Sequence, residues 1–289
     1  MMKKIITLMI TAFCLHISLP AFAEIKVGVM APRGALKTMK QWGELGTYLQ
    51  SSVGSEVKIV PLKANETVDA VLNGAVDYML TNPVLTVIME KKQAGTPIAT
   101  LNRKSGSQFA GVIIAKKGSG ITKGTDLKGK KVMAFKFRRS AAAYVFQVKH
   151  LIDQGIDPHK DFASFKEAKK QDDIVLAVKA GLVDAGFIKS GLLETMAKEG
   201  KINMDDFEIV DKQTDSLKHV HSTILYPEWY MSASVKADAA TTAKLKVALL
   251  KLNAGDKASQ SAGIVGFADA LSLNNLDATL KSLKLPPYE

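Results

Sequence analysis

The sequence predicts an α/β protein of two lobes, each a mostly parallel sheet flanked by helices, joined by two crossing hinge segments. Strand patterns alternate with helix patterns along the chain, as they do in βαβ units. One helix–turn–strand pattern occurs twice, 107 residues apart. Segments 99–116 and 221–234 are expected to cross between the lobes, outward and back. The length of 289 residues suits two lobes better than one large sheet.

The first 23 residues have the pattern of a secretory signal peptide. Lys3 and Lys4 precede an apolar run over 5–19, and Ala21-Phe22-Ala23 supplies small residues where a signal peptidase cleaves. The run is short for a spanning helix, which needs about 20 residues, although a retained anchor is the alternative. We expect cleavage after Ala23 and a periplasmic product.

Composition excludes several functions. Lys and Arg number 39 and Asp and Glu 28, a net charge of +11; removing Lys3 and Lys4 leaves +9. Such a charge suits a nucleic acid, an anionic membrane or a small anion. Export and an aromatic content of only 7% argue against nucleic acid. Cys14, the single cysteine, falls in the predicted signal, so the mature protein has no thiol nucleophile or ligand.

The first lobe is predicted over 24–110 and 221–289. Leu36, Met39, Trp42, Leu45 and Leu49 recur at helical spacing after a first strand. The C-terminal helices are expected to return to this lobe. The predicted strands are 25–30, 57–60 and 76–80, and the predicted helices 36–49, 68–72, 238–254 and 277–283.

The second lobe is predicted over 111–220. The letters A-V-x-x-G-x-V-D occupy 70–77 and again 177–184, so a helix ends at glycine and a strand follows in both places. Chance similarity is the alternative. The predicted strands are 131–135, 183–188 and 207–211, and the predicted helices 140–152 and 174–180. A discontinuous lobe hinged to a continuous one forms a cleft, where ligands commonly bind.

The chain resembles the type II periplasmic binding proteins, in their phosphonate-binding-like branch. The motifs that carry the resemblance span the mature chain: VGVMAPRG at 27–34, AVDYMLTNP at 75–83, DLKGKKV at 126–132, GIDPHKDF at 155–162 and DDIVLAVKAGLVDAGFIKSGLLE at 172–194. The resemblance implies a solute-binding protein with that fold.

Within that branch the chain is similar to the extracytoplasmic sensor half of tetrathionate- and thiosulfate-responsive histidine kinases. LTNP at 80–83, SGLLETMAKEGKI at 190–202 and STILYPEW at 222–229 carry the likeness. Because the chain ends at Glu289 without a kinase domain, we expect a free binding protein. We also expect a monomer, and no cofactor. It would deliver its ligand to an ABC permease or to a separate sensor kinase, which the sequence leaves open.

Two candidate ligand-binding residues follow strands of the first lobe. Arg33 comes after the first strand, at the carboxyl edge where open α/β sheets bind ligands. Asn82 precedes Pro83 at a helix start whose N–H groups suit an anion. The alternatives are a solvated loop arginine and a helix cap.

A basic turn between strand and helix supplies three more candidates, Arg138, Arg139 and Ser140. Guanidinium forks match oxyanions bidentately, so this turn favours a strongly anionic ligand. The resemblance implies a Ser-, Thr- or Gly-rich turn here, and the arginines put those hydroxyl contacts in doubt. A solvated basic turn is the alternative.

Ser190 and Tyr226 complete the predicted site. Ser190, in Lys189-Ser190-Gly191, corresponds to the Asn82-Pro83 position through the repeat. Tyr226 lies on the return crossing with Glu228 and Trp229, which could line the cleft mouth or pack the hinge.

Catalytic and metal chemistry find little support. His219 and His221 would share one face of a strand, but no third ligand is identifiable, so we expect no metal. The sequence has no G-x-S-x-G, H-E-x-x-H or P-loop motif. We expect a solute-binding protein that closes on a small oxyanion, with an unrecognised exported enzyme acting on a small anion as the alternative.

Overall fold

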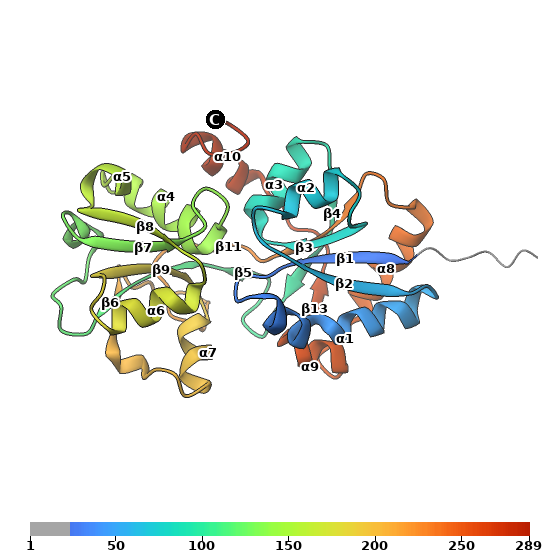
Figure 1. The fold of residues 1–289 in the computed structure, drawn as a ribbon, viewed down its shortest axis with the longest axis horizontal. Helices are drawn as coiled ribbons and strands as arrows, with labels where there is room; N and C mark the ends of the chain where they lie inside the picture. The colour runs from blue at the N-terminus through green and yellow to red at the C-terminus, as the bar shows by residue number, and fades with distance from the viewer. Residues whose placement is uncertain (1–23) are drawn as a thin grey trace, which may run out of the picture.

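A computed structural model describes residues 24–289. The predicted signal peptide, its cleavage site and Cys14 lie outside the described residues. Two separate sheets, each flanked by helices, make up two bodies that lie side by side (Figure 1). No helix among residues 24–289 is both long and apolar enough to cross a membrane.

The first lobe contains a six-stranded sheet in the order β13-β4-β12-β3-β1-β2. Its helices cover both faces, with α1, α8 and α9 packed together on one and α2, α3 and α10 on the other (Figure 1). The strands are β1 (Ile25–Met30), β2 (Val57–Leu62), β3 (Tyr78–Thr81), β4 (Gly95–Asn102), β12 (Tyr230–Ser234) and β13 (Gly266–Ala268). The helices are α1 (Ala35–Val53), α2 (Thr67–Leu72), α3 (Pro83–Lys91), α8 (Ala239–Lys251), α9 (Lys257–Ala262) and α10 (Asn274–Ser282).

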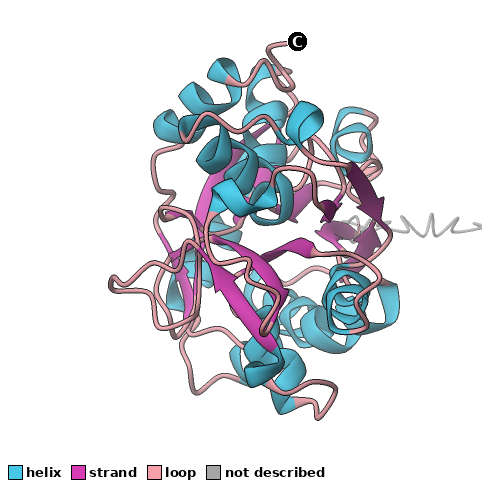
Figure 2. Ribbon diagram, turned by 90° about the vertical axis from the view of Figure 1, so that its left-hand side faces the viewer, coloured by secondary structure: helices cyan, strands magenta, loops and turns pink. Residues whose placement is uncertain are grey.

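The second lobe contains a five-stranded sheet in the order β10-β6-β9-β7-β8. The strands are β6 (Gly111–Lys116), β7 (Lys131–Phe135), β8 (Ser164–Ala168), β9 (Ala185–Lys189) and β10 (Phe207–Val210). The helices are α4 (Phe146–Asp153), α5 (Pro158–Asp161), α6 (Gln171–Lys179) and α7 (Leu192–Lys198). A π-helical turn over Ala141–Val145 precedes α4, and short 3₁₀ turns occupy Gly124–Leu127 and Met204–Asp206. Figure 2 views the molecule from the side of this lobe.

The two crossings lie between the sheets. Strand β5 (Gln108–Phe109) on the outward crossing pairs antiparallel with β11 (Tyr226–Pro227) on the return. All strands of the six-stranded sheet lie within 24–110 or 221–289, and all strands of the five-stranded sheet lie within 111–220. The exact lobe boundaries stay a prediction. Parallel pairing holds for β1, β2 and β3 and for β7, β8 and β9, whereas the other pairs are antiparallel because the crossing strands enter from the opposite direction.

One expected helix face is shorter than its pattern. In α1, Trp42, Leu45 and Leu49 are buried as predicted, but Leu36 is 86% exposed. Met39 is also largely exposed. The first turn of α1 follows Gly34, whose φ of 97° favours glycine.

The internal repeat is a repeated structural unit. Gly74 and Gly181 both take the left-handed conformation after α2 and α6. Asp77 then accepts a hydrogen bond from the Lys26 backbone N–H at 2.8 Å, and Asp184 accepts one from the Lys131 N–H at 2.7 Å. Each aspartate thus joins the start of the third strand of its unit to the first.

Asp77→Ala and Asp184→Ala are therefore expected to destabilise the protein by similar amounts, about 1 kcal/mol each, the net contribution of one hydrogen bond. Urea unfolding measures this loss. Asp205→Ala, at an exposed aspartate, is the control and should change stability by less than about 0.5 kcal/mol. Unequal losses for Asp77→Ala and Asp184→Ala would mean that the two units are not equivalent.

Candidate functional site

A cavity of about 980 Å³ lies between the lobes and is called the interlobe cavity below. The first lobe contributes the loop after β1, the first turns of α1, the end of α9 and the outward crossing. The second lobe contributes the carboxyl end of β9, the start of α7 and His219. Trp42, Phe109 and Trp229 supply aromatic walls. Both lobes therefore face one space large enough for a small organic or inorganic ligand.

Positive charge predominates in the interlobe cavity. Eight of its lining residues are Lys or Arg: Arg33, Lys37, Lys40, Arg103, Lys104, Lys189, Lys198 and Lys201. Three are carboxylates: Glu194, Glu199 and Glu228. Cations gathered in a concave site raise the local concentration of anions.

A buried ion pair lies beside Lys189 in this cavity. Glu228 is 1% exposed, and its Oε1 accepts a hydrogen bond from Arg103 Nε at 2.6 Å. Its Oε2 accepts one from the Trp229 backbone N–H at 3.0 Å. Burial works against ionisation, but the charges of Arg103 and Lys189 prevail and lower the pKa of Glu228. Arg103 is thereby held in place by a charged, doubly hydrogen-bonded carboxylate.

A second group of ion pairs joins the lobes at the edge of the cavity. Arg33 donates to both carboxylate oxygens of Asp172, at 2.8 and 2.7 Å, and to both of Glu199, at 3.1 and 3.0 Å. Lys37 also lies 3.0 Å from Asp172, and Lys201 pairs with Glu199. Arg33 and Lys37 belong to the first lobe, whereas Asp172, Glu199 and Lys201 belong to the second. This group is called the interlobe ion-pair cluster below.

The interlobe ion-pair cluster shifts the titration of its carboxylates. Burial raises the pKa of Asp172, but hydrogen bonds from Arg33 and Lys37 outweigh it and lower that pKa to about 2. Hydrogen bonds from Arg33 and then Lys201 lower the pKa of Glu199 to about 2. Both carboxylates are therefore charged at neutral pH, as is Arg33 between them.

The structure brings Arg33 and Ser190 to the interlobe cavity among the predicted site residues. Both guanidinium edges of Arg33 are engaged by Asp172 and Glu199 rather than directed to open space. Ser190 is 4% exposed, and its Oγ accepts a hydrogen bond from the Ala110 N–H at 3.1 Å. Ser190 Oγ thus fixes the crossing strand and keeps its O–H available to donate.

Asn82 is a buried helix cap outside the cavity lining. Its Oδ1 accepts from the Leu85 N–H at 3.2 Å, and its Nδ2 donates to the Arg139 carbonyl at 3.1 Å. Pro83 follows at the first helical position, as the sequence indicates. Asn82 therefore caps α3 and contacts the other lobe through the backbone of the basic turn.

The basic turn over 136–140 also lies outside the lining of the interlobe cavity. Arg138 pairs with Glu289, and Lys136 pairs with Glu167 at 2.9 Å. Ser140 is buried and precedes the π-helical turn, with no capping hydrogen bond from its side chain. The side chains of Arg138, Arg139 and Ser140 are thus not gathered with Arg33 and Ser190.

Tyr226 and the histidines have structural contacts. Tyr226 is 2% exposed and stacks on Phe146 with ring centroids 3.9 Å apart, which packs the crossings. The expectation that His219 and His221 share a strand face is wrong, because no strand includes them. His221 faces Asp215 at 3.0 Å, whereas His219 faces Glu194 at 3.5 Å. No group of three or more metal-ligating side chains occurs within residues 24–289.

The sequence reasoning missed Arg103 and the side chain of Lys189. The repeat did contain a signal for Lys189, because a step of 107 residues from Asn82 ends on it. Asn82 follows β3 and Lys189 ends β9, and each of these strands is central in its sheet. Arg103 had no such signal, since its partner Glu228 lies 125 residues further along the chain.

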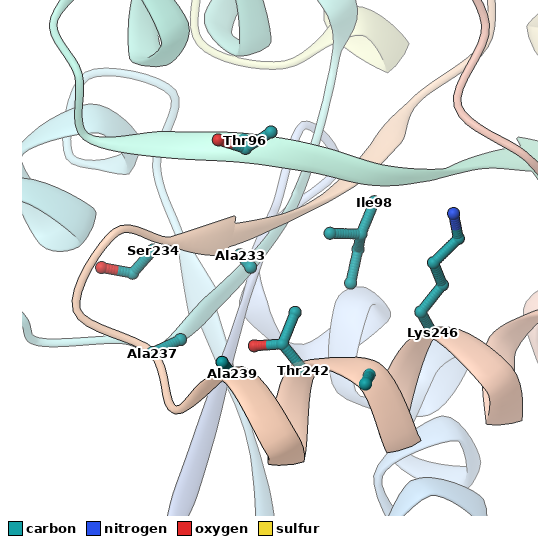
Figure 3. Close-up of a pocket in the computed structure, with 9 residues that line it drawn as sticks. Thr96, Ile98, Ala233, Ser234, Ala237, Ala239, Thr242 and Lys246 are labelled. Carbon is teal, nitrogen blue, oxygen red and sulfur yellow. The ribbon is translucent and has the colours of Figure 1, made fainter.

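A second cavity, of about 340 Å³, lies between β4, β12 and α8 in the first lobe. Figure 3 shows Thr242 and Lys246 projecting from α8 toward Thr96 and Ile98 on β4. Its lining is mostly alanine and threonine, and its one cation, Lys246, lies 3.2 Å from Asp269. This cavity has no charge excess and suits an anion poorly.

The two flanked sheets and the cavity between them define a two-lobed binding protein of the type II periplasmic fold. The chain belongs to the family described as "ABC transporter, phosphonate, periplasmic substrate-binding protein", whose model matches residues 27–272. It is therefore an extracytoplasmic solute-binding protein, and members of this class are binding proteins rather than enzymes.

A curated relative supports the predicted likeness to sensor kinases. The tetrathionate sensor histidine kinase TtrS of Salmonella typhimurium is 32% identical over 213 residues. The match covers 72% of this chain and 36% of that protein, so the chain spans about a third of its relative's length.

Solved structures confirm the fold. XAC2383 from Xanthomonas citri bound to ATP matches with a TM-score of 0.74 and 18% identity, over 90% of this chain and 98% of that one. PhnD1 from Prochlorococcus marinus in complex with methylphosphonate has the same TM-score and coverage at 16% identity. A binding protein component of an ABC phosphonate transporter from Pseudomonas aeruginosa has a TM-score of 0.75 at 15% identity, over 90% of this chain and 85% of that one.

Proposed function

We propose that the protein captures a small oxyanion in the interlobe cavity. The observation that carries this proposal is the excess of cations that line the cavity from both lobes. Arg103 is held by Glu228, and Lys189 lies beside this pair with no carboxylate of its own within 4.0 Å among residues 24–289. A negatively charged ligand would compensate this charge through charge-assisted hydrogen bonds, which are about twice as strong as neutral ones.

Phosphonates, phosphate esters and sulfur oxyanions are the candidate ligands. Methylphosphonate is bound by one structural neighbour, and tetrathionate is the stimulus named for the curated relative. The higher sequence identity of the latter favours a sulfur oxyanion. Chloride and ATP, bound by another neighbour, show that this fold accommodates anions of very different size.

The family also supports a proposal for the partner. We propose that the ligand-bound protein, a monomer exported by a signal peptide cleaved after Ala23, is recognised by an ABC permease or by a sensor histidine kinase. Ligand would favour one arrangement of the lobes because it contacts both, and the partner would distinguish that arrangement.

A thermal-shift screen of the purified protein tests this function. The ligands are methylphosphonate, phosphate, phosphite, thiosulfate, tetrathionate and organic acids, with arginine and choline as cationic and quaternary controls. At a ligand concentration of 100 times Kd, the free energy of unfolding should rise by about 2.7 kcal/mol. Stabilisation by arginine or choline with none by any anion would contradict the proposal, and consumption of the anion would show an enzyme instead.

A further inference from the structure

Lys189 is placed rigidly at the wall of the interlobe cavity. It is the last residue of β9, a central strand of the second sheet, and its register partner across the sheet is Gly111. Its backbone N–H donates to Gln171 Oε1 at 3.0 Å. Its Nζ lies 5.8 Å from the centroid of the Phe109 ring, which lines the same cavity. The amine is therefore held at the junction of the two lobes rather than on a free surface.

The positive charge of Lys189 is not compensated locally. No salt bridge joins its Nζ to a carboxylate in the part of the chain that the structure describes. Glu228 is the carboxylate with the largest effect on the pKa of Lys189, but it already accepts hydrogen bonds from Arg103 and from the Trp229 N–H. Two cations thus share one carboxylate, which leaves one positive charge for a ligand to balance.

Several charged groups from both lobes face Lys189. Burial, then the charge of Arg103, lowers the pKa of its amine to about 8; Arg33 adds to the lowering, and Glu228 and Glu194 oppose it. His219 lies against Glu194 and also lines the cavity. An ordinary lysine amine is fully protonated at pH 8, whereas this one loses part of its charge there.

We propose that Lys189 Nζ pairs directly with the bound oxyanion and that ligand capture draws a proton onto this amine. This inference rests on the proposed function and assigns the residue and the protonation change that accompany it. An anion beside the amine stabilises the ammonium form, so binding raises its pKa. By linkage, affinity is constant where the free amine is already protonated, and it falls by up to tenfold per pH unit between the pKa of the free amine and the higher pKa of the complex.

The pKa of Lys189 can be measured directly in protein labelled with ¹³C-lysine, with its Cε resonance assigned by its loss in Lys189→Arg. Without ligand, the resonance should titrate near pH 8. With saturating tetrathionate or methylphosphonate, whichever stabilises the protein more, the midpoint should rise by about one pH unit or more. A midpoint that is unchanged by the bound anion would overturn the inference.

Affinity measurements on variants give a second readout. Lys189→Met should weaken binding of the same anion at pH 7 by about tenfold to a hundredfold, the range for one charged hydrogen bond. Lys189→Arg should retain the charge and bind with an affinity that no longer falls between pH 8 and 9. Lys166→Met, which removes an exposed lysine from β8, is the charge-matched control and should bind like the wild type.

The two failures are distinguishable. If the wild type binds an anion and Lys189→Met binds it equally well, Lys189 is not the anchoring residue although the proposed function stands. If Lys189→Met weakens binding but titration calorimetry in buffers of different ionisation enthalpy finds no proton uptake at pH 8, the proton coupling is wrong. If the wild type binds no anion, both the function and this inference fail.

Discussion

Glu228→Ala is expected to lower the free energy of unfolding by about 3 kcal/mol, the cost of removing one partner from a buried ion pair. Glu228 is 1% exposed and balances Arg103 and Lys189, so its loss leaves two positive charges close together in a partly buried site. It also removes the acceptor of the Trp229 N–H on the return crossing. Urea unfolding at pH 7 measures the loss.

An exposed carboxylate provides the control for Glu228→Ala. Glu208 lies on β10 and pairs at 2.7 Å with Lys117, whose side chain is 62% exposed. Because surface ion pairs contribute little, Glu208→Ala should cost less than about 1 kcal/mol. Equal losses for the two variants would show that the Arg103–Glu228 pair has no special role in the fold.

The stabilisation by Glu228 has a predictable pH dependence. Its pKa is lower in the folded protein than in the unfolded chain, so its contribution is present at neutral pH. The contribution is lost as the pH falls below the unfolded value of about 4.3, because the unfolded chain then takes up a proton that the folded carboxylate still excludes. Between pH 5 and pH 3, the wild type should therefore lose more stability than Glu228→Ala loses.

Arg33→Ala is expected to loosen the contact between the lobes. The variant removes the first-lobe group that binds both Asp172 and Glu199, so these carboxylates keep only the pairs with Lys37 and Lys201 that the cluster contains. In solution scattering without ligand, the radius of gyration should increase relative to the wild type. The reason is that the four hydrogen bonds from Arg33 to Asp172 and Glu199 are lost, so that of the interlobe ion-pair cluster only Lys37–Asp172 still joins the two lobes.

Acid should reproduce the effect of Arg33→Ala in the wild type. The pKa of Asp172, about 2, lies roughly two units below its ordinary value, which corresponds to about 2.5 kcal/mol. Because the folded pKa is lowered, this stabilisation is complete above about pH 4 and is lost as the pH falls toward 2.

Lys63→Ala, which breaks an exposed pair with Glu66, is the control for Arg33→Ala and should leave the radius of gyration unchanged. A wild type and an Arg33→Ala variant of equal size at pH 7 would contradict this account of the cluster.

The fold was predictable from the sequence because its signals are local. The spacing of Trp42, Leu45 and Leu49 marks the buried face of α1, and Asn82 with Pro83 marks the start of α3. Gly74 and Gly181 end their helices through the same backbone conformation. Each of these features depends on residues within a few positions, so periodicity and cap chemistry were sufficient.

The site was less predictable because its charges meet across long sequence separations. Arg33 was expected near the cleft and lines the interlobe cavity, but its pairing with Asp172 joins residues 139 apart. The basic turn contains two adjacent arginines, yet the pairing of Arg138 with Glu289 and its distance from the cavity lining depend on tertiary packing. Lys189 was not predicted as a site residue although it adjoins Ser190. A sequence pattern indicates which residues are polar, but not which of them lacks an ion-pair partner.

A crystal structure of the protein with its most stabilising anion would locate the ligand directly. Tetrathionate or thiosulfate can be located by the anomalous signal of sulfur. We expect the anion in the interlobe cavity, within hydrogen-bonding distance of Lys189 Nζ and with donors from both lobes. An anion bound at the basic turn over 136–140 or at the cavity beside α8, with the interlobe cavity holding only water, would contradict it.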